Sequence, residues 1–173
     1  QTGLECIGDL SDEDICEVLR LACESLELIN KKWMLTLSSV SLLAALLDGA
    51  GLSECDRAEA ENAIKCKNSE TLKRLCGENT ELAKCLSGVF SDAKTAFSKL
   101  NAAAKNENTK AEIKKLEDLY LSVKDENTRS KIRLDFSIVD GAEYYSGAVF
   151  KGYIDGIDSP VLSGGRYDRL MKK

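Results

Sequence analysis

The pattern of apolar and polar residues predicts that the chain begins with a strand. Residues 1–8 alternate between polar and apolar side chains through Leu4, Glu5 and Cys6, and Ile7 ends the alternation. A strand needs neighbours with which to pair, so we expect this chain to be a piece of a longer protein.

A helix is predicted next, from Ser11 to about Asn30. Ser11 and Asp14 have the spacing of a capping box, and the acidic residues that follow Ser11 suit the positive end of a helix dipole. Apolar residues then recur every three or four positions, which gives the helix one buried face: Ile15, Val18, Leu19, Ala22, Cys23, Leu26 and Ile29. A short strand at 33–37 and a second apolar helix at 39–49 are expected to follow.

The segment from 53 to about 127 is rich in Ala, Glu, Lys, Asn and Leu, and it contains no proline. Apolar residues keep a helical period through most of it, so we expect an all-helical block. The expected helices are 54–65, 69–76, 80–100 and 109–124.

At Lys131 the apolar period changes to that of a strand, and we expect strands at 132–138, 144–153 and 161–162. The run 163–168 reads as a turn leading into another helix. This order of elements predicts an α+β fold, with an antiparallel sheet and flanking helices in 1–52 and 128–173, interrupted by a helical insertion at 53–127.

Composition narrows the possible functions. The chain has 173 residues and a net charge of −5, and no apolar run approaches the roughly 20 residues of a membrane helix. The acidic balance argues against DNA and other nucleic acids as partners. The absence of histidine removes the commonest general base and zinc ligand, which excludes most hydrolase chemistry.

The seven cysteines are odd in number and include no C-x-x-C pair, so we interpret them as reduced thiols of a cytoplasmic protein. Cys16 and Cys23 lie seven residues apart on one helix face, where we favour packing of the thiols in the core over metal binding or redox chemistry. We therefore expect no metal site.

Three short runs are candidates for ligand binding, each with a structural alternative. Paired glycines before Arg166 and Tyr167 allow close approach of a ligand, although such a pair more often forms a tight turn. Tyr144 and Tyr145, at a strand start, would point to opposite faces, so one could line a pocket or simply join the core. Gln1 and Glu5 would share a strand face, where they could receive a small cation or only solubilise the surface.

Taken together, these runs resemble the histidyl-tRNA synthetase family. The residues that carry the resemblance are Gln-x-Gly-x-Glu-x-x-Gly at 1–8, Tyr-Tyr-x-Gly-x-Val-Phe at 144–150 and Ser-Gly-Gly-Arg-Tyr-Asp at 163–168, with a helical insertion between. The resemblance implies part of a class II synthetase core, an antiparallel sheet flanked by helices. It covers nearly the whole chain and is weakest across the helical block.

The resemblance also implies a histidine pocket. By matching motif positions, its histidine-binding residues would be Gln1, Glu5, Tyr144, Tyr145 and Tyr167. The loops lining the pocket would contribute Asp140, Gly141, Gly164, Gly165 and Arg166. A carboxylate and tyrosine hydroxyls can exchange directional hydrogen bonds with an imidazole or an ammonium group.

One departure indicates a branch of the family that does not aminoacylate. Synthetases carry Arg-Gly-Leu-Asp-Tyr-Tyr, and their arginine contacts carboxylate and phosphate groups, whereas this chain has Asp140 at that position. An aspartate there would repel a triphosphate. The segments 35–52 and 149–153 are more similar to the paralogous regulatory subunits of ATP phosphoribosyltransferase.

This similarity implies a non-catalytic protein without a cofactor, whose partner is the short catalytic subunit that begins histidine biosynthesis. It would support that subunit and relay feedback inhibition by histidine. Full-length members are expected to be cytoplasmic homo-oligomers that do not bind tRNA or membranes. Two alternatives stay open: a fragment of a catalytic histidyl-tRNA synthetase, and a module whose helical block binds a protein partner.

Overall fold

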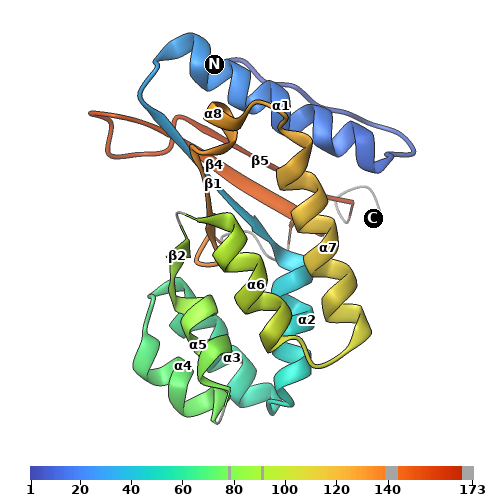
Figure 1. The fold of residues 1–173 in the computed structure, drawn as a ribbon, viewed down its shortest axis with the longest axis vertical. Helices are drawn as coiled ribbons and strands as arrows, with labels where there is room; N and C mark the ends of the chain where they lie inside the picture. Colours follow the sequence, from blue (N-terminus) through green and yellow to red (C-terminus); the bar gives the residue numbers. More distant parts are fainter. Residues whose placement is uncertain (78, 91, 139–143, 169–173) are drawn as a thin grey trace.

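The computed structural model describes residues 1–77, 79–90, 92–138 and 144–168. Its helices and strands follow the expected α+β order (Figure 1). They are α1 (Asp12–Ile29), β1 (Trp33–Ser39), α2 (Val40–Ala50), α3 (Glu54–Lys65), α4 (Ser69–Cys76), α5 (Thr80–Ser87), β2 (Val89–Phe90), α6 (Ala93–Ala103), α7 (Glu107–Ser122), α8 (Glu126–Arg129), β3 (Ile132–Asp135), β4 (Ala148–Ile154) and β5 (Leu162–Gly165). None of the helices in these residues is long and apolar enough to cross a membrane.

The five strands form one sheet in the order β2-β3-β1-β4-β5. Three of its pairings are antiparallel, as the sequence predicts, but β1 and β3 run parallel. Parallel neighbours need a long crossover, and the whole helical block serves as this connection. The block also contributes to the sheet, because β2 lies within it and pairs with β3 at the sheet edge.

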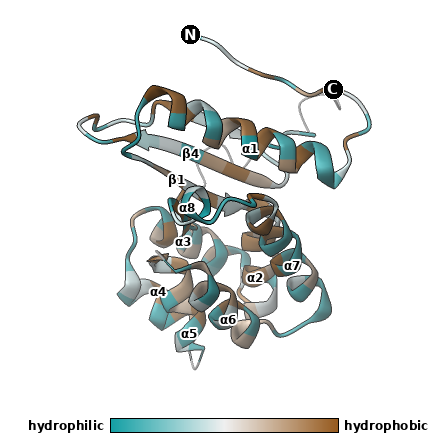
Figure 2. Ribbon diagram, turned by 45° about the horizontal axis from the view of Figure 1, so that its top comes forward, coloured by the Kyte–Doolittle hydropathy of each residue, from teal (hydrophilic) through white to brown (hydrophobic). Residues whose placement is uncertain are grey.

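One face of the sheet is apolar and packs against α1. A Cβ atom on Gly152 would lie 2.7 and 2.9 Å from the two methyl carbons of Leu26, so this position of β4 faces the helix closely. Directly opposed residues of antiparallel strands share a face, which places Leu35 on the same side as Gly152. Figure 2 shows α1 lying along β4 and β1.

The opposite face of the sheet is polar. Thr36 of β1, Lys151 of β4 and Ser163 of β5 are aligned across it by the strand register. The Thr36 hydroxyl donates to the carbonyl of Lys151 at 3.3 Å. Ser38 is fully buried, and its hydroxyl has no hydrogen-bond partner among the described residues. This face therefore carries polar groups at buried positions, which is typical of a binding surface rather than of a core.

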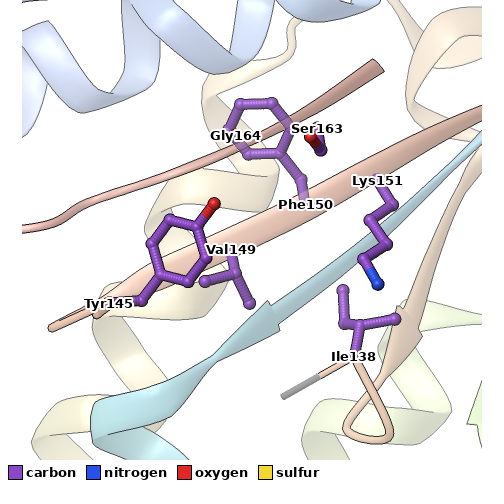
Figure 3. Close-up of a pocket in the computed structure, with 7 residues that line it drawn as sticks. All are labelled: Ile138, Tyr145, Val149, Phe150, Lys151, Ser163 and Gly164. Carbon is purple, nitrogen blue, oxygen red and sulfur yellow. The ribbon is translucent and has the colours of Figure 1, made fainter. Parts of the chain in front are cut away.

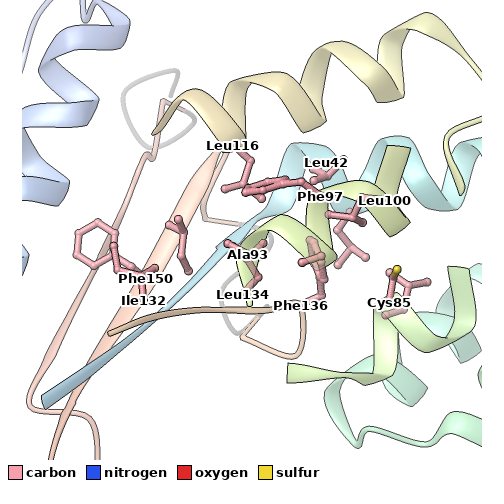
Figure 4. Close-up of a cluster of buried hydrophobic side chains, with 14 of the residues drawn as sticks. Leu42, Cys85, Ala93, Phe97, Leu100, Leu116, Ile132, Leu134, Phe136 and Phe150 are labelled. Carbon is pink, nitrogen blue, oxygen red and sulfur yellow. The ribbon is translucent and has the colours of Figure 1, made fainter. Parts of the chain in front are cut away.

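A continuous apolar core joins the helical block to the covered face of the sheet (Figure 4). It brings α2, α6 and α7 against β3 through side chains that are at most 4% exposed: Leu42, Phe97, Leu100, Leu116, Ile132, Leu134 and Phe136. An ion pair adds a polar link, because Lys67, between α3 and α4, lies 2.9 Å from the buried carboxylate of Asp135.

Several of the elements expected from the sequence differ in the structure. Residues 1–7 form no strand and are exposed, because no strand among the described residues pairs with them. The expected helix 80–100 is interrupted at Gly88, where the chain forms β2, and Asp92 then caps α6 by accepting hydrogen bonds from the amides of Lys94 and Thr95. The run 163–165 belongs to β5 instead of a turn. The helix expected after Asp168 lies outside the described residues.

Candidate functional site

The candidate site lies where the β4–β5 hairpin continues beyond its last paired residues. In the β4–β5 pairing Val149 lies opposite Gly165, and backbone hydrogen bonds continue past this pair toward the residues before β4 and after β5. The amide of Arg166 donates to the carbonyl of Ala148 at 2.9 Å, and the amide of Ser146 donates to the carbonyl of Arg166 at 2.8 Å. The segments 144–147 and 166–168 are therefore held side by side, although 20 residues separate them in sequence.

Three tyrosines gather at this end of the hairpin. The rings of Tyr144 and Tyr145 meet edge to face with centroids 5.2 Å apart, and Tyr144 stacks on Tyr167 at 5.3 Å. The sequence placed Tyr144 and Tyr145 on opposite faces of a strand, which is wrong, because β4 begins only at Ala148 and the tyrosines precede it in a turn.

Glu5 of the N-terminal segment joins this cluster. The Glu5 carboxylate lies close enough to the phenol of Tyr167 to act on it electrostatically. Burial raises the pKa of Tyr167 above its ordinary value, and the negative charge of nearby Glu5 raises it further. The site therefore holds a carboxylate beside a neutral phenol, an arrangement that can accept hydrogen bonds from a cationic or N–H-bearing ligand.

A cavity of about 90 Å³ opens beside Tyr145 (Figure 3). Its walls come from β4, β5 and the segment after β3: Ile138, Tyr145, Val149, Phe150, Lys151, Ser163 and Gly164. It is smaller than the roughly 300–1,000 Å³ of sites that enclose drug-sized molecules, so it suits one small chemical group.

The two glycines of β5 allow aromatic rings to approach the strand. A Cβ atom on Gly164 would lie 2.5 Å from the Phe150 ring, and one on Gly165 would lie 2.8 Å from the Tyr145 ring and from the Ala148 carbonyl oxygen. The sequence favoured a tight turn here. The structure instead shows extended backbone in which any larger residue would displace a ring that borders the cavity.

Arg166 is engaged with its own hairpin. Its guanidinium forms an ion pair with Asp168 at 2.8 Å, and the Ser146 hydroxyl donates to the same carboxylate at 3.0 Å. The Arg166 side chain also covers Gly147, where a Cβ would lie 3.3 Å away. Arg166 thus stabilises the loop and is not one of the residues that line the cavity.

The structure does not show the other residues expected at the site in contact with the tyrosine cluster. Gln1 is exposed and makes no hydrogen bond within the described residues, so its place at the site stays a prediction. Asp140 and Gly141 lie outside the described residues. No group of three or more potential metal ligands occurs in the part of the chain that the structure describes.

Five residues of the cavity wall were not among the site residues expected from the sequence: Ile138, Val149, Phe150, Lys151 and Ser163. Lys151 and Ser163 could have been found from the alternation of β4 and the hairpin register, since both follow from the position of Val149. Ile138 could not, because it follows the end of β3 and no strand register fixes its position.

The sheet, its helical crossover and the tyrosine cluster together define a class II synthetase-like core. The chain belongs to the histidyl-tRNA synthetase family, whose model matches residues 1–173. Among curated proteins it is similar to the ATP phosphoribosyltransferase regulatory subunits of Clostridium botulinum strain 657, with 28% identity over 99% of this chain and 43% of the relative, and of Oceanobacillus iheyensis, with 30% identity over 100% and 44%. The chain therefore spans less than half the length of these relatives.

Solved structures share the fold. An ATP phosphoribosyltransferase regulatory subunit/histidyl-tRNA synthetase from Bacillus halodurans C matches with a TM-score of 0.78 and 24% identity, over 96% of this chain and 45% of that chain. An ATP phosphoribosyl transferase complex from Thermotoga maritima matches with a TM-score of 0.73 and 17% identity, over 93% and 58%. These matches confirm the class II-like fold that the sequence motifs predict.

Proposed function

We propose that this chain is the core of a non-catalytic regulatory subunit of ATP phosphoribosyltransferase, which supports the catalytic subunit in the first step of histidine biosynthesis. In this role it binds free histidine at the tyrosine site and relays feedback inhibition. The observation that carries the proposal is the gathering of Glu5, Tyr144, Tyr145 and Tyr167 beside one small cavity.

The chemistry of this cluster suits an imidazole. An imidazole N–H can donate to the Glu5 carboxylate, and the tyrosine rings offer flat surfaces on which a small ring can stack. The names of the curated relatives support the regulatory role, since their matched segments cover nearly all of this chain. Asp140 supports the absence of adenylate formation, because a negative charge at that position opposes binding of a triphosphate.

We infer the other partners from the same branch of the family. The full-length protein is a cytoplasmic homo-oligomer that binds the catalytic subunit and neither DNA nor tRNA, in keeping with the net charge of −5 on the 173 residues of this chain.

The test is calorimetric titration of histidine into the full-length natural protein, with and without ATP, followed by co-purification with the catalytic subunit. Histidine binding without pyrophosphate release, together with capture of the catalytic subunit, is the expected result. Failure to bind histidine would refute the proposed site.

A second candidate is a catalytic histidyl-tRNA synthetase, which the description of the matching family model favours. It requires adenylate formation in spite of Asp140. Pyrophosphate release that depends on both ATP and histidine would establish this candidate and refute the regulatory assignment.

A further inference from the structure

An ion pair joins the helical block to the sheet beside the candidate site. Lys67, in the turn between α3 and α4, places its ammonium 2.9 Å from Oδ2 of Asp135, the last residue of β3. Asp135 is only 5% exposed, and its Oδ1 accepts hydrogen bonds from the amide and the hydroxyl of Ser137 at 2.9 and 2.6 Å. One carboxylate therefore connects the helical block with the turn that follows β3.

This turn leads directly to the wall of the cavity. Ile138, the residue after Ser137, is 7% exposed and lines the cavity together with Tyr145. Figure 3 shows Ile138 on the segment after β3, with Tyr145 on the other side of Val149. Ile138 lies outside the strands of the described residues, so the contacts of the turn determine its position, and a strand register does not.

The backbone of Lys67 is in a conformation that favours glycine. Its φ is +52°, and in the described part of the chain it is the one residue other than glycine with a positive φ. A side chain makes this left-handed conformation unfavourable, and residues held in it are frequent at functional sites. The ion pair with Asp135 is a contact that glycine could not make, and it offsets the cost of this conformation.

We propose that Lys67 is a positioning residue of the amino-acid site, which holds Asp135 so that the turn keeps Ile138 against the cavity. The inference rests on the proposed binding of free histidine and adds the helical block to the elements that set its affinity. Without the ammonium, the Asp135 carboxylate would turn toward water, because an unpaired buried charge is unfavourable. The hydrogen bonds to Ser137 would then weaken, and Ile138 would shift.

The shift should be confined to the residues after Phe136. Phe136 is fully buried, and Asp135 lies opposite Val89 of β2 in the strand register, so the end of β3 is held independently of the ion pair. Loss of the Lys67 ammonium can therefore alter the cavity wall without opening the core. Histidine binding can then be measured in a folded variant.

The experiment measures histidine affinity by calorimetric titration into the full-length protein and its variants. Lys67→Met and Lys67→Gly both remove the ammonium, and glycine also relieves the left-handed backbone, so it gives a second test should Lys67→Met not fold. Lys67→Arg keeps a cation at this position. Lys65→Met is the matched control, because Lys65 is an exposed residue of the same block without an ion pair among the described residues. Thermal unfolding verifies that each variant is folded.

A double-mutant cycle with Ile138→Ala tests the route from Lys67 to the cavity. We expect Lys67→Met and Lys67→Gly to weaken histidine binding about fivefold, and Lys67→Arg and Lys65→Met to leave it within about twofold. In an Ile138→Ala background, Lys67→Met should change the affinity less than about twofold, because the residue through which it acts has been truncated. A merely structural role of Lys67 would not produce this dependence on Ile138.

Three results would overturn the positioning role alone: wild-type affinity in both Lys67→Met and Lys67→Gly, equal losses with and without the Ile138 side chain, or a loss in Lys65→Met as large as in Lys67→Met. A folded wild type that binds no histidine would overturn the proposed histidine site and this inference with it.

Discussion

Replacing Gly165 with alanine should damage the stability of the hairpin and the geometry of the site together. The added methyl group would lie 2.8 Å from the Tyr145 ring and 2.8 Å from the Ala148 carbonyl oxygen. That oxygen accepts the hydrogen bond of the Arg166 amide at 2.9 Å, so it cannot move without weakening the β4–β5 pairing. The ring must therefore retreat by about 0.6 Å, the difference between 2.8 Å and the 3.4 Å of ordinary contact.

The size of the effect follows from two opposing contributions. Overpacking by one methyl group costs about 1–3 kcal/mol, and the upper end applies because one of the two neighbours is backbone. Alanine also reduces the conformational entropy of the unfolded chain relative to glycine, which stabilises the folded protein by about 0.4–1 kcal/mol. The free energy of unfolding should therefore fall by about 2 kcal/mol, which corresponds to a decrease in Tm of about 4–8 °C.

The assay is thermal unfolding combined with histidine titration, and Gly152→Ala is the matched control. Gly152 lies on the opposite face of the same hairpin, where its added methyl group would meet Leu26 at 2.7 Å. Both variants should lose stability, but only Gly165→Ala should also weaken histidine binding, roughly fivefold, through the displaced Tyr145. Unchanged affinity in Gly165→Ala, or equal losses of affinity in both variants, would refute the placement of Tyr145 at the site.

Four further predictions concern the charged and buried groups. Lys67→Met removes the cation beside buried Asp135 and should lower the free energy of unfolding, measured in urea, by about 1–3 kcal/mol. The control Lys114→Met, which breaks an exposed ion pair, should lower it by about 0.5 kcal/mol or less. Equal losses in the two variants would contradict a stabilising role for the Lys67–Asp135 ion pair. Glu5→Gln should lower the raised pKa of Tyr167 in an ultraviolet titration. Because that pKa is raised on folding, its contribution to stability is complete below the ordinary value of about 10 and is lost as the pH rises through the folded pKa. Burial raises the pKa of Cys23 to about 12 and that of Cys85 to about 11, so neither should react with a thiol reagent at pH 8 until the protein unfolds, whereas Cys55 and Cys66 should react in the native state. Hydrogen bonds from Lys131, Trp33 and Lys31 lower the pKa of Glu27 from its ordinary value of 4.5 to about 2. The stability that the charged Glu27 carboxylate adds is therefore present above pH 4.5 and is lost as the pH falls through the folded pKa of about 2. The fluorescence of Trp33, the single tryptophan, should report this transition, and a midpoint near 4.5 would contradict it.

Local signals in the sequence were sufficient for most helices and for the central strands. The capping box of Ser11 and Asp14 begins α1 as expected, and the change of apolar period at Lys131 marks the start of β3. The failures have one physical cause, since each depends on a pairing between distant segments. The segment 80–100 has helical residues throughout, yet Val89 and Phe90 leave the helix because β3 offers an edge with which they can pair.

The candidate site shows the same division between local and distant information. The motifs identified Glu5, Tyr144, Tyr145 and Tyr167, but residue spacing alone could not bring together segments at the start, the middle and the end of the chain. The pairing of Val149 with Gly165 brings the segments of Tyr144 and Tyr167 together, because it extends outward through Ser146 and Arg166 to set the tyrosines side by side. The same register aligns Lys151 with Thr36 and Ser163 on the polar face. A slip of one residue would turn Lys151 toward α1 and Phe150 toward the polar face, exchanging a charge for an aromatic ring in the apolar core. The hydrophobic pattern that stabilises the sheet thus also selects which face carries the site.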